Sequence, residues 1–163
     1  MADDIKIREA LLDRDGSCRD VNFANPSWEG VGNLRDWVRS QYSGLEIATY
    51  FPTSVTEPTW IPQQRGENSH ILASQGKIFI RLLQVFISRE EDDSPFVELT
   101  FFPQDVEDIP DLAARFCDLA DSWARLLQAT QYFVRYENAS WQFGDCGDRS
   151  GVIFSKQCSP DTP

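Results

Sequence analysis

Hydrophobic residues are most concentrated between Lys77 and Arg89, where the sequence reads KIFIRLLQVFISR. This run does not alternate between apolar and polar residues, as a strand with one solvent-exposed face would. Its β-branched and aromatic residues favour a strand over a buried helix, which is the competing interpretation. We therefore predict a central strand that is buried on both faces.

Two segments have apolar residues at the spacing of an amphipathic helix. The first begins at Asn25, a capping residue followed by proline, and is predicted to end at Gly44 in a left-handed cap. Two glycines in its first turns weaken the helix and permit close packing. The second begins with Asp108 as its cap and carries a continuous apolar stripe through residues 112–126.

The remaining strands are predicted from alternating or continuous apolar segments. These segments are 18–24, 45–51, 70–74, 96–102, 132–136 and 152–155. Residues 4–12 are predicted to pair with 18–24 in a hairpin around an Asp-Gly turn, with a helix as the alternative. This order predicts one α+β domain over residues 1–157, a mostly antiparallel sheet with two amphipathic helices packed on one face. Residues 158–163 are predicted to be a disordered tail.

A proline-containing segment, residues 52–69, connects two predicted strands. Its three prolines forbid a helix and disfavour a central strand. Trp60 either anchors this loop to the core, which we favour, or presents an exposed contact. Because the two helices cover only one face of the sheet, either this loop folds across the other face or that face is an interface.

Charge narrows the classes of partner. The formal net charge is -11 and the sequence pI is about 4.4. Binding to nucleic-acid phosphate or to an anionic membrane needs clustered Lys and Arg, so both are disfavoured. A basic protein partner fits, although acidity also serves solubility alone. The sequence has no apolar stretch of transmembrane length and no signal peptide, which predicts a cytoplasmic protein.

Catalytic and metal-binding motifs are not found in the sequence. His70 is the one histidine and has no nucleophile motif near it, so we interpret it as structural. The four cysteines, Cys18, Cys117, Cys146 and Cys158, form no CxxC pair, and we expect no metal and no cofactor. We therefore predict a protein that is not an enzyme.

Acidic clusters and exposed aromatic residues remain as candidates for binding a partner. One cluster is a turn after the central strand, and the other lies before the second helix, where capping accounts for only part of the charge. The C-terminal hairpin adds a tryptophan and two aspartates. The predicted contact residues are Trp60, Glu90, Glu91, Asp92, Asp93, Asp105, Glu107, Trp141, Asp145 and Asp148.

Two segments, CRDVNFANPSWEGVGNLRDWV and YFVRYENASWQFGDCGDRSGVIF, resemble small bacterial immunity proteins of polymorphic-toxin systems. Those proteins are acidic cytoplasmic α+β domains that bind and block a cognate toxin. The resemblance implies occlusion of a toxin without catalysis, and it transfers no contact residues.

The function predicted first is an immunity protein, monomer or homodimer, whose acidic surface meets a basic toxin domain. A dimeric secretion chaperone that binds an extended partner segment is the alternative, although the predicted N-terminal hairpin disfavours it. A third interpretation is an enzyme with an unrecognised site, which a deep pocket lined by convergent carboxylates would favour.

Overall fold

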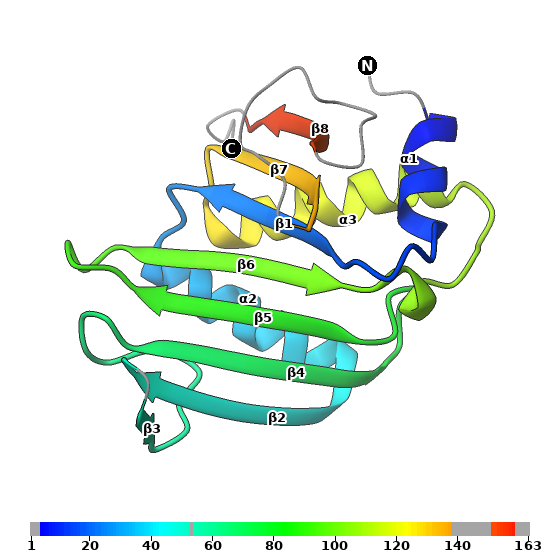
Figure 1. Cartoon of the computed structure of the whole chain (residues 1–163). Helices are drawn as coiled ribbons and strands as arrows, with labels where there is room; N and C mark the ends of the chain where they lie inside the picture. Colours follow the sequence, from blue (N-terminus) through cyan, green and yellow to red (C-terminus); the bar gives the residue numbers. More distant parts are fainter. Residues whose placement is uncertain (1–3, 53, 138–150, 159–163) are drawn as a thin grey trace.

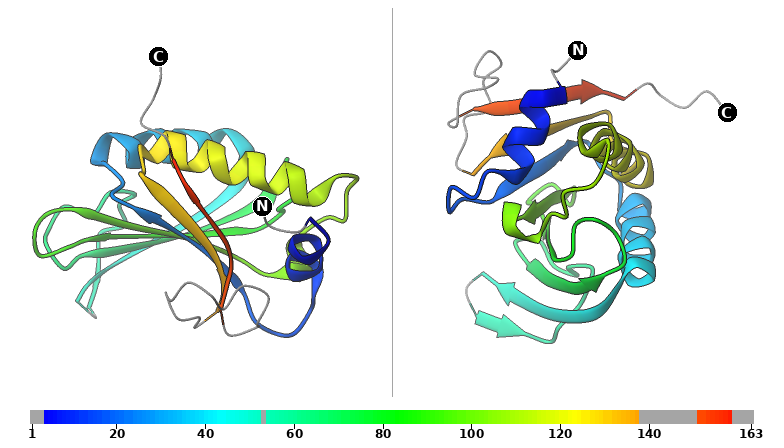
Figure 2. Two further views of the ribbon diagram at one scale, coloured as in Figure 1. Left: turned by 90° about the horizontal axis from the view of Figure 1, so that it is seen from above. Right: turned by 90° about the vertical axis from the view of Figure 1, so that its right-hand side faces the viewer.

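The computed structural model describes residues 4–52, 54–137 and 151–158. In this part of the chain, an eight-stranded antiparallel sheet carries two long helices on one face (Figures 1 and 2). The predicted α+β class, with a mostly antiparallel sheet, is confirmed.

The helices are α1 (Asp4–Leu12), α2 (Trp28–Gln41) and α3 (Leu112–Leu127), with a short 3-10 helix η1 (Pro103–Asp105). The strands are β1 (Arg19–Ala24), β2 (Tyr42–Phe51), β3 (Ser54–Thr56), β4 (Asn68–Gly76), β5 (Leu83–Arg89), β6 (Pro95–Phe101), β7 (Gln131–Tyr136) and β8 (Val152–Gln157). Their order across the sheet is β3-β2-β4-β5-β6-β1-β7-β8. The N-terminal strand β1 therefore joins the β2–β6 strands to the β7–β8 pair.

Helices α2 and α3 lie beside each other over the same face of the sheet (Figure 2). Gly30 is a point of close approach, since a Cβ atom there would lie 2.3 Å from the carbonyl oxygen of Leu127. The predicted close packing at a glycine of α2 is confirmed. Apolar side chains of both helices and of the facing strands form the core, including Leu34, Phe116 and Val85, all fully buried.

The central strand is shorter than predicted and is not buried on both faces. Strand β5 covers only Leu83–Arg89, where buried side chains alternate with half-buried ones. Residues 77–82 instead turn the chain and make one isolated bridge, between Ile80 and Val106. The apolar run therefore contains two elements: a turn that packs Ile80 into the core, and an amphipathic strand. Taken together as one strand, the two elements show no alternation of apolar and polar residues.

Residues 4–12 form α1, so the predicted hairpin is wrong and its helical alternative is confirmed. Strand β1 is flanked by β6 and β7, which leaves no edge for residues 4–12. Arg19, fully buried, fixes the connection between α1 and β1. Its guanidinium donates to the carbonyl oxygens of Ala10 at 2.7 Å and Asp13 at 3.0 Å, and to the Asp15 carboxylate. Arg19 thus satisfies carbonyl groups at the C-terminal end of α1.

The boundaries of α2 differ from those predicted. Ser27 is the cap, and its hydroxyl accepts a hydrogen bond from the Gly30 amide at 2.9 Å. Asn25, the predicted cap, lies two residues earlier with φ 54°. At the other end, Tyr42 begins β2 directly, and Gly44 lies inside that strand. The helix ends because the chain enters the sheet, so no glycine cap is needed.

The described part of the proline loop, residues 52–69, folds onto the helix side of the sheet. Trp60 is 6% exposed, and the Arg39 guanidinium of α2 lies 5.7 Å from the centre of its ring. The Thr59 amide donates at 2.8 Å to the hydroxyl of Thr49, which is buried on that side. The anchoring role of Trp60 is confirmed. Of the two alternatives for the other face of the sheet, the one in which this loop folds across it is wrong.

Strands β7 and β8 pair as predicted for the C-terminal hairpin, while residues 138–150 lie outside the described part of the chain. Cys158, assigned to the predicted tail, is half-buried and its amide donates to the Thr130 carbonyl oxygen at 2.8 Å. The structure therefore extends one residue into that segment, and residues 159–163 are not described.

Candidate functional site on the open face of the sheet

The face of the sheet opposite α2 and α3, here called the open face, has no described helix or strand over it (Figure 2). Strand pairing places mostly polar and aromatic side chains there in two rows, because directly paired residues point to the same face. One row contains Leu72, Gln84, Thr100, Asp20 and Arg135. The adjacent row contains His70, Phe86, Glu98, Asn22 and Phe133.

A hydrogen-bonded polar cluster crosses β6, β1 and β7 on the open face. The Asn22 amide donates to Glu98 at 2.8 Å, and Arg135 Nε donates to the Asn22 side-chain oxygen at 2.7 Å. Arg135 also approaches the carboxylates of Glu98 at 3.4 Å and Asp20 at 3.8 Å. The Thr100 hydroxyl donates to Asp20 at 2.8 Å. The cluster therefore fixes the positions of two carboxylates with its own donors.

Burial changes the protonation behaviour of this cluster. Asp20 is 5% exposed, and burial raises its pKa above the usual range, with the Glu98 carboxylate adding to the effect. Burial also raises the pKa of the Cys18 thiol to about 12, with Asp20 and Glu137 adding to it. Cys18 is therefore a neutral thiol at physiological pH, and it donates to Asp20 at 3.6 Å rather than serving as a nucleophile.

A pocket of about 530 Å³ opens beside this cluster. Four strands and their ends contribute the wall, which contains three carboxylates, one guanidinium and two phenylalanine rings. The lining residues are Cys18, Asp20, Gln84, Phe86, Glu98, Thr100, Phe102, Arg135 and Glu137. Three carboxylates against one guanidinium give the wall a formal charge of -2 when all are ionised.

His70 belongs to the open face as a structural group. Its ring stacks on Phe86 with 4.4 Å between ring centroids and an interplanar angle of 2°. Its Nε2 lies 3.0 Å from the Gln84 side-chain oxygen. These contacts agree with the predicted structural role, and they hold Phe86 at the edge of the pocket.

The predicted acidic turn, Glu90–Asp93, lies at the far end of the β5–β6 hairpin from the pocket (Figure 1). Asp93 pairs with Arg65 at 2.8 Å and with Arg89 at 3.6 Å, and the Arg65 guanidinium lowers the pKa of Asp93. The Arg89 guanidinium lies 4.0 Å from the centre of the Trp28 ring, and the Trp28 indole donates to the Asp93 carbonyl oxygen. The turn is thus fastened to α2.

The second predicted acidic cluster is at the other end of β6, so the two do not combine into one surface (Figure 1). Glu107 pairs with Arg81, and burial raises the pKa of Asp105. Asp108, the predicted cap of α3, pairs instead with Arg8 of α1. The residue before α3 is Asp111, with φ 57° and no capping hydrogen bond from its side chain, so the predicted cap at Asp108 is wrong.

Of the predicted contact residues in the proline loop and the C-terminal hairpin, the structure describes only Trp60. Trp60 is a core residue, as described above, which removes it from the accessible surface. Trp141, Asp145 and Asp148 lie outside the described residues, as does Cys146.

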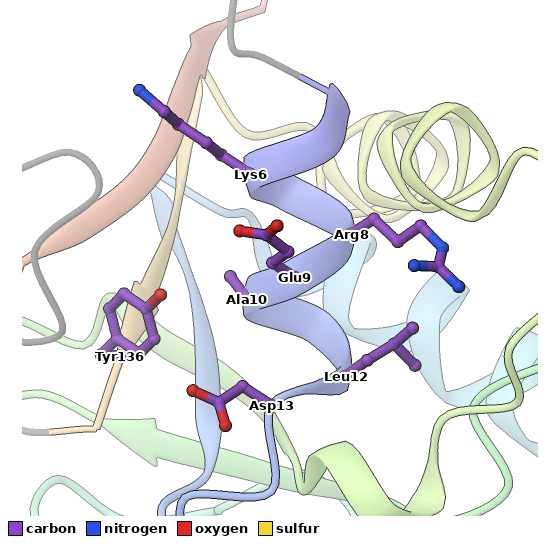
Figure 3. Close-up of a pocket in the computed structure, with 7 residues that line it drawn as sticks. All are labelled: Lys6, Arg8, Glu9, Ala10, Leu12, Asp13 and Tyr136. Carbon is purple, nitrogen blue, oxygen red and sulfur yellow. The ribbon is translucent and has the colours of Figure 1, made fainter.

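A second pocket, of about 610 Å³, lies between α1 and β7 (Figure 3). Lys6, Glu9 and Tyr136 extend into the space between the two elements, whereas Arg8 and Leu12 point to the other side of the helix. Its lining side chains do not converge on one point, and we assign this pocket no function.

The polar residues of the open face were missed in the sequence, although a signal for them exists. Charged and amide side chains are depleted in strands, yet β1 reads RDVNFA and β6 reads PFVELTF. Asp20 and Asn22, like Glu98 and Thr100, stand two residues apart and so share a face. The sequence therefore indicates polar residues on one face of β1 and of β6, but it does not indicate that β1 lies between β6 and β7.

Two features are absent from the described residues. No helix among them is long and apolar enough to cross a membrane. No group of three or more His, Cys, Asp or Glu side chains among them is arranged to hold a metal ion.

No family model matches the sequence, and no curated protein matches it either. The fold is similar to that of a chain in the crystal structure of the toxic C-terminal tip of CdiA from Pseudomonas aeruginosa in complex with an immune protein. The TM-score is 0.57 at 10% sequence identity, over 88% of this chain and 97% of that chain. The resemblance to toxin-immunity systems suggested by the sequence is therefore matched at the level of the fold.

Proposed function

We propose that this protein is an immunity protein, which binds a bacterial toxin domain and blocks it without catalysis. The observation that carries the proposal is the shared fold with a chain of a toxin–immune protein complex, over nearly the whole length of both chains. Fold alone does not determine function, so the proposal also needs support from charge and surface.

The net charge of this chain fits the inhibitor of such a complex better than it fits a toxin that cleaves nucleic acid. A chain with a net charge of -11 repels nucleic-acid phosphate, whereas it attracts a domain that is basic because it binds phosphate. Such attraction speeds encounter and weakens as salt is added. We therefore propose a basic toxin domain as the partner and the cytoplasm as the place of action.

The open face is the proposed binding surface. The opposite face is covered by α2, α3 and the anchored part of the proline loop, including Trp60. Side chains of the open face are held by the Asn22–Glu98–Arg135 hydrogen bonds, so little side-chain entropy remains to be lost on binding. Rigid, charged groups on a sheet face that no described helix or strand covers suit a protein that blocks its partner by occupying a surface.

The proposal predicts a toxin domain encoded next to this protein's gene, and it is tested with the two purified proteins. Light scattering is expected to find a stable complex whose dissociation constant rises with salt. A toxin domain that elutes separately from this protein at low salt, at micromolar concentrations of both, would refute the proposal.

The structure removes one argument against the secretion-chaperone alternative. The predicted N-terminal hairpin counted against it, and residues 4–12 are helical instead. A chaperone of this kind is expected to be a dimer in solution, so the mass of the isolated protein discriminates. A monomer that binds the folded toxin domain favours the immunity protein.

An enzyme is the second functional class with a specific observation in its favour. The open-face pocket holds Asp20, whose pKa is raised by burial, beside Glu98, and such pairs occur in acid–base catalysis. Against it, both carboxylates already accept hydrogen bonds from Thr100 and Asn22. Loss of toxin neutralisation without loss of toxin binding in Asp20→Asn would favour catalysis.

A further inference from the structure

We infer that the open-face pocket receives the guanidinium group of an arginine on the protein partner. The inference rests on the proposed function, because it identifies the contact through which a basic toxin domain would be recognised. Its support comes from the charge, shape and aromatic lining of the pocket.

The charge of the wall selects a cation. Among the described residues, Asp20, Glu98, Glu137 and Arg135 are the charged groups of the wall, which gives it a formal charge of -2 when all are ionised. Glu137 is exposed and accepts a hydrogen bond from the Cys18 amide at 3.2 Å. Carboxylate oxygens at the mouth of the pocket therefore keep acceptor capacity for an incoming donor.

The aromatic residues select a planar cation over a compact one. Phe86 lines the pocket, and His70 stacks on one face of its ring. Phe102 adds a second ring to the wall. A guanidinium can stack on a ring while it donates to carboxylates in its own plane, whereas an ammonium is a hydrated point charge.

The size of the pocket agrees with a side chain rather than with a large ligand. A volume of about 530 Å³ lies in the lower half of the range of small-molecule sites, which span roughly 300–1,000 Å³. The pocket is set in the open face, so a residue projecting from a docked protein surface can enter it while its neighbours contact the surrounding strands.

The experiment is an NMR titration of the 15N-labelled protein with N-acetyl-arginine methylamide at pH 7 and low salt. We expect saturable shifts at the amides of Asp20, Glu98 and Glu137. The citrulline analogue has nearly the same shape without the charge, and should cause none. The lysine analogue is expected to bind more weakly than the arginine probe.

Two variants locate the site. Glu137→Gln changes an exposed side chain and is expected to raise the dissociation constant of the arginine probe roughly fivefold or more. Glu91→Gln, in the acidic turn, removes the same charge far from the pocket and should leave the dissociation constant unchanged.

Equal shifts with citrulline, shifts confined to the acidic turn, or no shifts would overturn the inference. In each of those cases a salt-sensitive complex with the toxin domain would leave the proposed function standing. Conversely, arginine binding in the pocket together with no toxin complex would support the pocket and refute the immunity protein.

Discussion

Arg135 donates from its Nε to the side-chain oxygen of Asn22 at 2.7 Å, across the β1–β7 pair. The other end of the same amide donates to Glu98 at 2.8 Å on β6. One buried amide therefore links a cation and an anion from segments 37 residues apart in the chain, and keeps both in fixed positions on the open face.

Removal of this amide should destabilise the protein. Asn22→Ala removes one hydrogen bond from Arg135 and one from Glu98 in a largely buried place, and we expect the free energy of unfolding to fall by about 1–3 kcal/mol. Urea denaturation measures this change. Asn33→Ala is the control, because its amide makes a 3.2 Å hydrogen bond on the exposed surface of α2, and it should change stability by about 0.5 kcal/mol or less.

Replacing either of two glycines in α2 by alanine should change the stability of the protein in opposite directions. In Gly30→Ala the new methyl group would overlap the Leu127 carbonyl oxygen, so α2 and α3 must separate, and a loss of about 1–3 kcal/mol is expected. In Gly32→Ala the nearest atom is 3.9 Å away, at the flexible end of Arg35, and better helix propensity should add up to about 1 kcal/mol. Thermal denaturation of both variants checks this, and similar melting temperatures would contradict the close packing.

The turn after α1 should contribute pH-dependent stability. Burial alone would raise the pKa of Asp15, but hydrogen bonds from Ser17 and Arg19 outweigh it and lower the pKa to about 2. Because the folded-state pKa lies below the ordinary value of 3.8, the stabilisation is full above pH 4 and is lost as the pH falls toward 2. Asp15→Asn should therefore destabilise the protein at pH 7 by roughly 1–3 kcal/mol, and by less at pH 2.5.

Asp92 provides the matched control for that prediction. It accepts hydrogen bonds from the amide and hydroxyl of Ser94, as Asp15 does from Ser17, but in an exposed turn without a buried guanidinium. Asp92→Asn is expected to have a much smaller effect at pH 7. Equal losses in the two variants would mean that the turn, and not Arg19, accounts for the stabilisation.

Cys18 should resist alkylation while the protein is folded. Its side chain is 7% exposed, and burial with the nearby carboxylates raises the pKa of the thiol to about 12, so little thiolate forms at pH 8. Mass spectrometry after iodoacetamide treatment should find Cys18 unmodified in buffer and modified in urea. Rapid modification in buffer would show a reactive thiol and would favour an enzyme.

The sequence predicted the helices and strands better than it predicted which strands pair in the sheet. Helical spacing identified the bodies of α2 and α3, alternation identified β2, and apolar segments identified β6 and β7. The start of β5 at Leu83 could not be predicted from residues 77–89, because a continuous apolar pattern does not distinguish a buried turn from a buried strand. The insertion of β1 between β6 and β7 depends on long-range pairing, and that pairing is what brings Asp20 to Arg135.

The measurement that tests the central claim most directly is the growth of cells that express the toxin domain encoded beside this protein's gene. We predict that the wild-type protein restores growth. Gln84→Arg with Ser88→Arg, which adds two positive charges to β5 on the open face, should abolish the protection. Asn33→Arg with Ser40→Arg adds the same charge on α2, on the opposite side, and should protect like the wild type. No protection by the wild type, or equal protection by both double variants, would contradict the account.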